Sequence, residues 1–472
     1  MKRGYFYGTV ALFGALFIFL YWRLLIGLEI FTHDSIVWYG SFHYFIDSLS
    51  NWSFPFWDPY SLTGNPFYPA IHAHGMLDPL SFLALFMVKI LKTSILTSFS
   101  YFYLFRLIVF IAGAYFLFKV ISRSHIAALL AAGVLLLAIT PGIFRQMGIL
   151  QNVFLAPFSM YSLIKTLEHA ETKRRYAYLA GLAATIGVSL NVFIPAYFLF
   201  NLFAFTIVIV ITGCVKIDRF KAVFQGRRAW AYTLAIFVML VFIAAPAFTL
   251  FMESRSPDNE HFPSVRIIQK NNQLFKQIDA SGLTDDVLSA KFTNHKGVYA
   301  GVGNLLNLAY PDLWKYYFGE RGGFRFTSSR FGGDFVSEAI IYIGIIPFLA
   351  ALIGLIYSKS RYRYVVALML VFITVNMVSW SGVHNQPANL IQRVFNIMFP
   401  PLKMMEVRET LSGYFLLYIC ALLSLGISLA PSAENIKRLV DERWRSLIGL
   451  AAGVVAIKIL ITFYYFKTAV FI

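Results

Sequence analysis

The chain has 472 residues, of which 58% are hydrophobic, 18% aromatic and 13% charged. A soluble domain of this composition would have too little polar surface to cover its core, so an ordinary soluble protein is excluded. The formal net charge is +17. Because the lysines and arginines fall mostly in short loops between apolar runs, they indicate membrane topology and not nucleic-acid binding.

Apolar runs long enough to cross about 30 Å of hydrocarbon as helices recur along the chain. They predict an all-α polytopic membrane protein with eleven spans, at residues 6–30, 99–118, 126–141, 149–165, 176–192, 194–214, 230–250, 339–357, 364–380, 411–430 and 446–466. The start could be a secretory signal. However, Trp22 and Arg23 continue the first apolar run without a small-residue cleavage site, which predicts a retained helix. Cys214 and Cys420 fall in apolar segments, so we expect no disulfide.

The basic residues orient the predicted spans. With the N-terminus in the cytoplasm, alternation places each short basic loop on the cytoplasmic side. These loops contain Lys119 and Arg123, Lys173 to Arg175, Lys216 to Arg228, Lys359 to Arg363, and Lys437 to Arg445. The apolar segment 77–92 is too short to cross, and a crossing there would turn the later basic loops outward. It is therefore predicted as a re-entrant or interfacial helix of an inner-membrane protein.

This topology divides the chain into three parts. Residues 1–250 form an N-terminal transmembrane module that includes a first external loop at 31–98, residues 251–338 form a large external loop of mixed structure, and residues 339–472 carry the C-terminal helices. A further external segment covers 381–410. The external loops are the place where we expect the chemistry.

The first external loop carries a cluster of ionisable and aromatic residues. Asp34 follows the first span directly and precedes an amphipathic stretch at 36–49. At the lipid surface its carboxylate could deprotonate a hydroxyl or hold a metal; alternatively, it caps the amphipathic helix. The other candidate substrate-loop residues here are His33, Asp58, Tyr60, His74 and Asp78. The histidines and aspartates could ligate a metal, although their spacing matches no known motif and polar loop residues are the common alternative.

Several segments resemble one family. The order HDS (33–35), FPFWDPYSLTGNPFYP (54–69) and LDPLSFL (77–83), with SEAIIYIGIIPFLAALIGL (337–355) and the segment at 400–429, resembles the YfhO-like bacterial membrane proteins of the GT-C glycosyltransferase superfamily. Residues 127–154 are similar to the pattern of oligosaccharyltransferases and protein mannosyltransferases, in which Pro-Gly and an Arg end a helix and an acid follows. Pro141, Gly142 and Arg145 match, but Asn152 stands near the acidic position.

The resemblance implies transfer of a sugar from a polyprenyl-phosphate carrier to a glycan, lipid or protein acceptor of the cell envelope. Asp34 would be the catalytic base, with Glu338 and Glu406 as second candidates. Cations would hold the donor phosphate, and ordinary contact with lipid headgroups is the alternative for each of them. They are Arg145, Arg330, Lys403 and Arg408.

The amide of Asn152 leaves the metal question open. Either the reaction needs no metal, or Asp334, Glu338 or Glu406 supplies the second carboxylate for a divalent cation such as Mg²⁺ or Mn²⁺. Two other functions also remain: a non-catalytic membrane subunit of a larger complex, favoured by Asn152, and a lipid or polysaccharide transporter. A transporter needs ionisable residues within its spans, and Arg23 and Arg106 are the candidates.

Overall fold

The computed structural model describes the chain in segments, and all structural statements refer to these. They are residues 3–26, 35–55, 57–58, 65–66, 76, 78–145, 147–168, 172–191, 195–215, 218, 223, 227–254, 300–301, 343–379 and 411–429. At several helix ends and in the short strands only the backbone is described.

The described part of the chain is helical. The helices are α1 (Arg3–Leu25), α2 (Ser35–Ser50), α4 (Pro79–Lys89), α5 (Ile95–Ser122), α6 (His125–Arg145), α7 (Met147–Val153), α8 (Ala156–Glu168), α9 (Thr172–Ser189), α10 (Pro195–Ile211), α12 (Arg227–Ser254), α18 (Ile345–Tyr357), α19 (Tyr362–Met377) and α21 (Ser412–Ser428). Two pairs of two-residue strands accompany them: β1 (Trp57–Asp58) with β2 (Asn65–Pro66), antiparallel, and β3 (Ala300–Gly301) with β4 (Val378–Ser379), parallel. The predicted all-α class is confirmed at this level.

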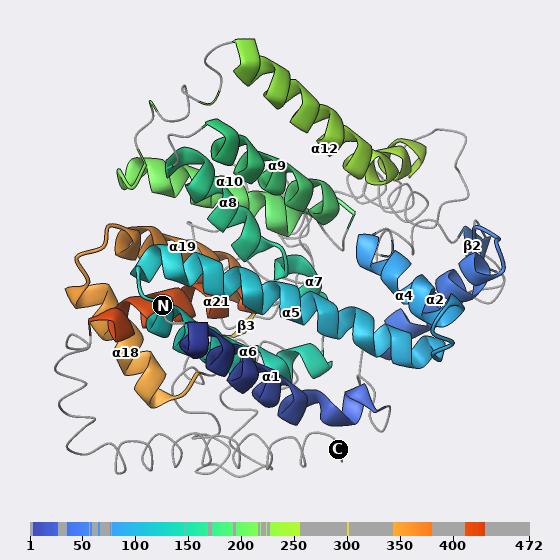
Figure 1. The fold of residues 1–472 in the computed structure, drawn as a ribbon, viewed down its shortest axis with the longest axis horizontal. Helices are drawn as coiled ribbons and strands as arrows, with labels where there is room; N and C mark the ends of the chain where they lie inside the picture. The colour runs from blue at the N-terminus through green and yellow to red at the C-terminus, as the bar shows by residue number, and fades with distance from the viewer. Residues whose placement is uncertain are drawn as a thin grey trace, which may run out of the picture.

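The long helix α5 lies at the centre of the bundle (Figure 1). It begins at a regular cap, where the Ser94 side chain accepts a hydrogen bond from the backbone N–H of Thr97 at 3.0 Å. It ends where Arg123 takes a left-handed conformation with φ of 57°. α1, α4, α6, α8 and α21 all pack against it, while α12 packs on α9 at the edge of the bundle. Its buried side chains therefore form the middle of the apolar core.

Interhelical contacts show which helix ends meet. We call the end with the α4–α5 connection at residues 90–94 the hairpin end. There Tyr101 of α5 donates to the Leu25 carbonyl at 2.7 Å. We call the opposite end, with the connections at Arg123 and at residues 358–361, the basic end. There Ser360 donates to the Ile121 carbonyl at 3.3 Å and Arg361 to the Gly213 carbonyl at 3.0 Å. The described residues at or just after the ends of α5, α10 and α18, three helices whose next loops carry basic residues, thus meet at one end.

In the part of the chain whose side chains are described, one helix is long and apolar enough to cross a membrane. This helix is α5. The described apolar parts of eight other helices have 10–17 residues. Several of these helices are longer than the part whose side chains are described. The backbone of α1, for example, is helical over 23 residues.

The structure corrects two helix boundaries. The span predicted at 149–165 is two helices, α7 and α8, separated by a turn at Phe154 and Leu155. Pro157 explains the break, because it has no N–H to donate to the carbonyl four residues earlier. Pro141 has the opposite outcome: α6 continues through it to Arg145. Pro-Gly therefore does not end this helix, as neighbouring helices can compensate for the missing bond.

α18 and α21 approach each other unusually closely. A Cβ atom at Gly426 would overlap the carbonyl oxygen of Ala350, and one at Gly354 would lie 2.5 Å from the backbone nitrogen of Gly426. Such contact is possible only between residues without side chains at the crossing point. Small residues in this arrangement are typical of helix pairs that associate within a bilayer.

Candidate functional site

The α4–α5 hairpin places two charged residues at the same depth in the bundle. Asp78 caps α4, accepting a hydrogen bond from the backbone N–H of Leu80 at 2.8 Å, and Pro79 occupies the first turn, where a missing N–H costs nothing. Asp78 precedes Lys89 by eleven residues, and Arg106 follows Ile95 by eleven. At 1.5 Å per residue, each lies about 16 Å from the hairpin end.

Asp78 and Arg106 form a buried ion pair. One carboxylate oxygen, Oδ2, lies 2.9 Å from Nη2 and 3.0 Å from Nε of the guanidinium. The two side chains are 1% and 0% exposed. Both charges have lost their water, so each depends on the other for compensation.

Aromatic rings surround the guanidinium. The Arg106 Cζ atom lies 4.1 Å from the ring centre of Phe102, 5.2 Å from that of Phe154 and 5.4 Å from that of Tyr103. Ring faces carry partial negative charge and attract a cation at this range. The Tyr103 hydroxyl also accepts a hydrogen bond from the side-chain amide of Gln151 at 2.7 Å. The pair is therefore embedded in a polar cluster that joins α4, α5 and α7.

This arrangement gives Asp78 a surrounding that the sequence did not predict. We expected it among the substrate-loop residues, whereas its carboxylate accepts bonds from a helix N-terminus and from two guanidinium nitrogens. In the described part of the chain it joins α4 to α5. Of the two arginines considered for a transport path, Arg23 is exposed near the end of α1, and Arg106 belongs to this pair.

Asn152, at the expected acidic position, is buried in α7. Asn152 is only 2% exposed. Its backbone carbonyl accepts a hydrogen bond from the Tyr414 hydroxyl at 2.6 Å. Gly413 also lies against α7, where an added Cβ would meet Val153 at 3.0 Å. The start of α21 is thus fixed beside α7.

Most of the other candidate residues lie outside the described segments. These are His33, Asp34, Tyr60, His74, Arg330, Glu338, Lys403, Glu406 and Arg408. For Arg145 and Asp58 the backbone alone is described: Arg145 is the last residue of α6, and Asp58 belongs to β1. Within the described segments, no three histidine, cysteine, aspartate or glutamate side chains come together as metal ligands would.

The ends of α1 and α6 nevertheless lie side by side. The hydroxyls of Tyr21 and Thr140 are 2.6 Å apart and buried. Arg145 follows Thr140 by five residues on α6, and Asp34 directly precedes the first residue of α2. α2 packs on the first turns of α5, with the rings of Tyr39 and Phe99 5.3 Å apart. The end of α1, the helix α2 and the backbone of Arg145 therefore belong to the hairpin end.

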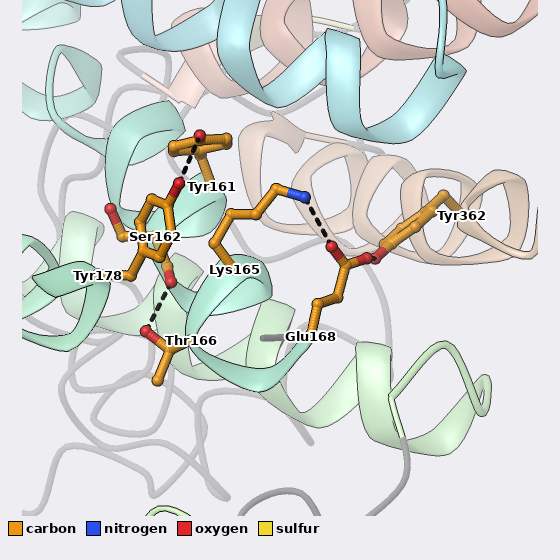
Figure 2. Close-up of polar contacts among 7 residues, drawn as sticks. All are labelled: Tyr161, Ser162, Lys165, Thr166, Glu168, Tyr178 and Tyr362. Carbon is orange, nitrogen blue, oxygen red and sulfur yellow. Dashed lines mark hydrogen bonds and ion pairs between the residues drawn. The ribbon is translucent and has the colours of Figure 1, made fainter. Parts of the chain in front are cut away.

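A second polar cluster lies at the basic end (Figure 2). The Glu168 carboxylate receives the Lys165 ammonium at 2.8 Å and the Tyr362 hydroxyl at 3.3 Å. The hydroxyls of Tyr161 and Tyr178 are 3.5 Å apart. These contacts connect α8 to α9 and α19. They are part-exposed and join helix ends, which is typical of a structural network.

Sequence reasoning did not identify two other buried polar residues, Asn201 of α10 and Asn376 of α19. The sequence feature that could have identified them is a single asparagine within each strongly apolar run, FLFNLFAF (198–205) and FITVNMV (372–378).

No family model matches the chain, and no curated protein is similar to it.

Proposed function

We propose that this chain is a polytopic membrane protein that transfers a sugar from a polyprenyl-phosphate donor to a cell-envelope acceptor. In this proposal the hairpin end faces away from the cytoplasm in a bacterial inner membrane, and the basic end faces the cytoplasm. Two kinds of observation support that orientation. The described ends of the loops after α5, α10 and α18, which carry basic residues, meet at one end of the bundle, and the short helix α4 packs on α5 from the other end.

One observation carries the proposal, the Tyr21–Thr140 contact. It joins the two helices that lead into Asp34 and Arg145, the residues on which the mechanism depends. A base and a phosphate-binding cation must border one cavity to act on one donor. Helix ends that pack together are a precondition for this, and ends on opposite sides of the membrane would have made it impossible.

The proposed reaction is a single displacement. The acceptor hydroxyl attacks the anomeric carbon, its proton passes to Asp34, and the bond from the sugar to the phosphate oxygen breaks with inversion. The polyprenyl phosphate leaves with the bonding electrons. Cations stabilise the charge on it. The candidates are Arg145, Arg330, Lys403 and Arg408, with Glu338 and Glu406 as alternative acid or base groups.

A divalent cation, if the enzyme uses one, would take its carboxylates from Asp34 and from Asp334, Glu338 or Glu406. Asn152 offers only a neutral amide, and that amide is buried in α7 beside Tyr414. The same observation favours a second candidate function, a non-catalytic subunit that keeps the fold and binds partner proteins.

The test is sugar transfer by purified protein in lipid nanodiscs, with radiolabelled prenyl-phosphate glucose and mannose as donors and membrane extract as acceptor. Asp34→Asn should abolish transfer while leaving the protein folded. Asp47→Asn is the matched control, because Asp47 is an exposed acid on α2 in the same external segment. Full transfer by the Asp34 variant would refute the assignment of the base. Absence of transfer by the wild type, together with co-purified partner proteins, would favour the subunit.

A further inference from the structure

Two buried amide oxygens have no hydrogen-bond donor. Asn201 and Asn376 are 1% and 2% exposed. Each donates from Nδ2 to a carbonyl of its own helix, to Tyr197 at 2.8 Å and to Phe372 at 2.7 Å. The side-chain oxygen Oδ1 of each has no partner. A buried polar atom left without a partner is costly, and in a native protein it calls for an explanation such as a water, an ion or a ligand.

Both asparagines lie within one ring of helices. α7 packs on α21, α21 on α19, α19 on α10, and α10 on α7, so the four contacts close on themselves. The ring centres of Phe200, which directly precedes Asn201, and of Phe372, one helical turn before Asn376, are 4.8 Å apart. Asn201 follows the buried Tyr197 by one turn, and Asn376 follows the buried Ile373. The amides therefore belong to the buried stripes of two neighbouring helices.

The two amides lie at about the middle depth of the bundle, level with Arg106. Counted from the basic-end contacts of Gly213, Arg361 and Ile121, Asn201 is about 18 Å away along its helix, and Asn376 and Arg106 are about 22 Å away. A molecule bound to either amide would lie at about the depth of the Asp78–Arg106 pair.

The helices of this ring are almost free of charge. α7, α10 and α21 contain no charged residue, and the one charged residue of α19 is Arg363, near the basic end. Oxygens that lack donors require a ligand that donates. Hydroxyl groups donate without bringing in a charge, which these helices could not compensate.

We infer that Asn201 and Asn376 bind hydroxyl groups of a neutral sugar. This inference rests on the proposed function and narrows its substrate class to donors or acceptors with an uncharged glycosyl group. It makes the two asparagines binding residues that recognise the sugar, whereas the cations named above recognise the phosphate. Each amide oxygen accepts one hydroxyl hydrogen bond that the protein alone does not supply.

The test measures affinity and stability on the same variants. The probes are glucose and glucuronic acid esters of a short prenyl phosphate, and the unglycosylated prenyl phosphate, each titrated onto protein in nanodiscs. Asn201→Leu and Asn376→Leu should each weaken binding of the glucose ester by about 3- to 10-fold, the worth of one neutral hydrogen bond. Affinity for the unglycosylated phosphate should not change, and the glucuronic acid ester should bind the wild type more weakly than the glucose ester.

Stability separates a ligand site from a structural amide. Since an unpartnered oxygen stabilises nothing, both leucine variants should keep or raise the melting temperature of the free protein. Asn191→Leu is the matched control. The buried Asn191 amide donates to the Gly187 carbonyl at 2.9 Å and to the Ile243 carbonyl at 2.7 Å. Its loss should lower the melting temperature without changing the affinity for the glucose ester.

Unchanged affinity in both leucine variants would overturn the inference, as would a fall in their melting temperature like that of the Asn191 variant, which would indicate structural water. These outcomes are distinct from failure of the proposed function. Binding without transfer would leave the sugar site standing and the enzyme in doubt. Transfer at wild-type rates by both leucine variants would support the enzyme and count against the sugar site.

Discussion

A double-mutant cycle on the buried ion pair tests whether Asp78 and Arg106 act as one unit. Asp78→Asn keeps the helix cap, because Asn caps as well as Asp, and removes only the charge. Arg106→Met keeps most of the apolar stem. Each single change leaves one buried charge without compensation and should lower the free energy of unfolding by about 3–5 kcal/mol.

The double variant should lose far less than the sum. With both charges gone, the remaining costs are the weakened contacts of the guanidinium with three aromatic rings and the loss of two hydrogen bonds, 2.9 and 3.0 Å long. We expect a total of about 1–2 kcal/mol, which means a coupling energy of at least about 4 kcal/mol. Arg106→Lys should fall between, since a lysine keeps the charge but cannot reach one oxygen with two nitrogens.

The assay is reversible unfolding by sodium dodecyl sulfate in mixed micelles, followed by the fluorescence of the native tryptophans. The variants should unfold at lower detergent fractions in the order expected from their free energies. Additive losses, with the double variant as unstable as both singles together, would refute the reasoning. The same result would follow if the two side chains separated in the folded protein.

Three further predictions follow from other contacts. Gly426→Ala should destabilise the protein by at least about 1–3 kcal/mol because α18 must move away, whereas Gly40→Ala, with nothing within 4 Å, should be neutral or stabilising in the same unfolding assay. In a cysteine-free background, Trp52→Cys should react with a membrane-impermeant maleimide on intact spheroplasts and Lys359→Cys only after lysis; the opposite pattern would invert the proposed orientation. Tyr362→Phe removes a part-exposed hydrogen bond at the end of α8 and should cost less than about 1 kcal/mol in that unfolding assay; a larger loss would make the basic-end cluster a major source of stability.

The apolar runs predicted the helices well, because the signal for a helix of this kind lies within each segment. A described helix overlaps each of the first ten predicted spans, and the eleventh, 446–466, lies outside the described residues. The short segment 77–92 contains α4, an 11-residue helix as its length required. Whether these helices cross a bilayer remains a prediction, which the labelling experiment tests.

Proline was harder to interpret, because its effect depends on neighbours that the sequence does not show. Pro141 lies inside α6, while Pro157 follows the break between α7 and α8. Both residues lack the same N–H. Pro141 leaves the Leu137 carbonyl without its usual helical donor, yet α6 continues, packed on α5 and α21. Tertiary packing decides whether such a residue bends, breaks or continues a helix.

The partners of buried polar residues are even harder to predict from the sequence than the effect of a proline. Arg106 in an apolar run reads from sequence as a transport residue, and Asp78 in a polar loop reads as a substrate residue. Only their contact, across 28 positions, reveals an ion pair. Periodicity identifies the face on which a residue lies, but it cannot identify a partner from another helix.

The ion pair also fixes one end of a segment whose other end packs elsewhere. Asp78 caps α4 about 16 Å from the hairpin end, whereas α2 packs on the first turns of α5. The two helices that flank residues 51–78 are therefore attached to α5 at two different depths. In the proposed mechanism the buried pair would hold α4 in place without touching the substrate, which is a sufficient reason for the protein to keep two charges in its apolar core.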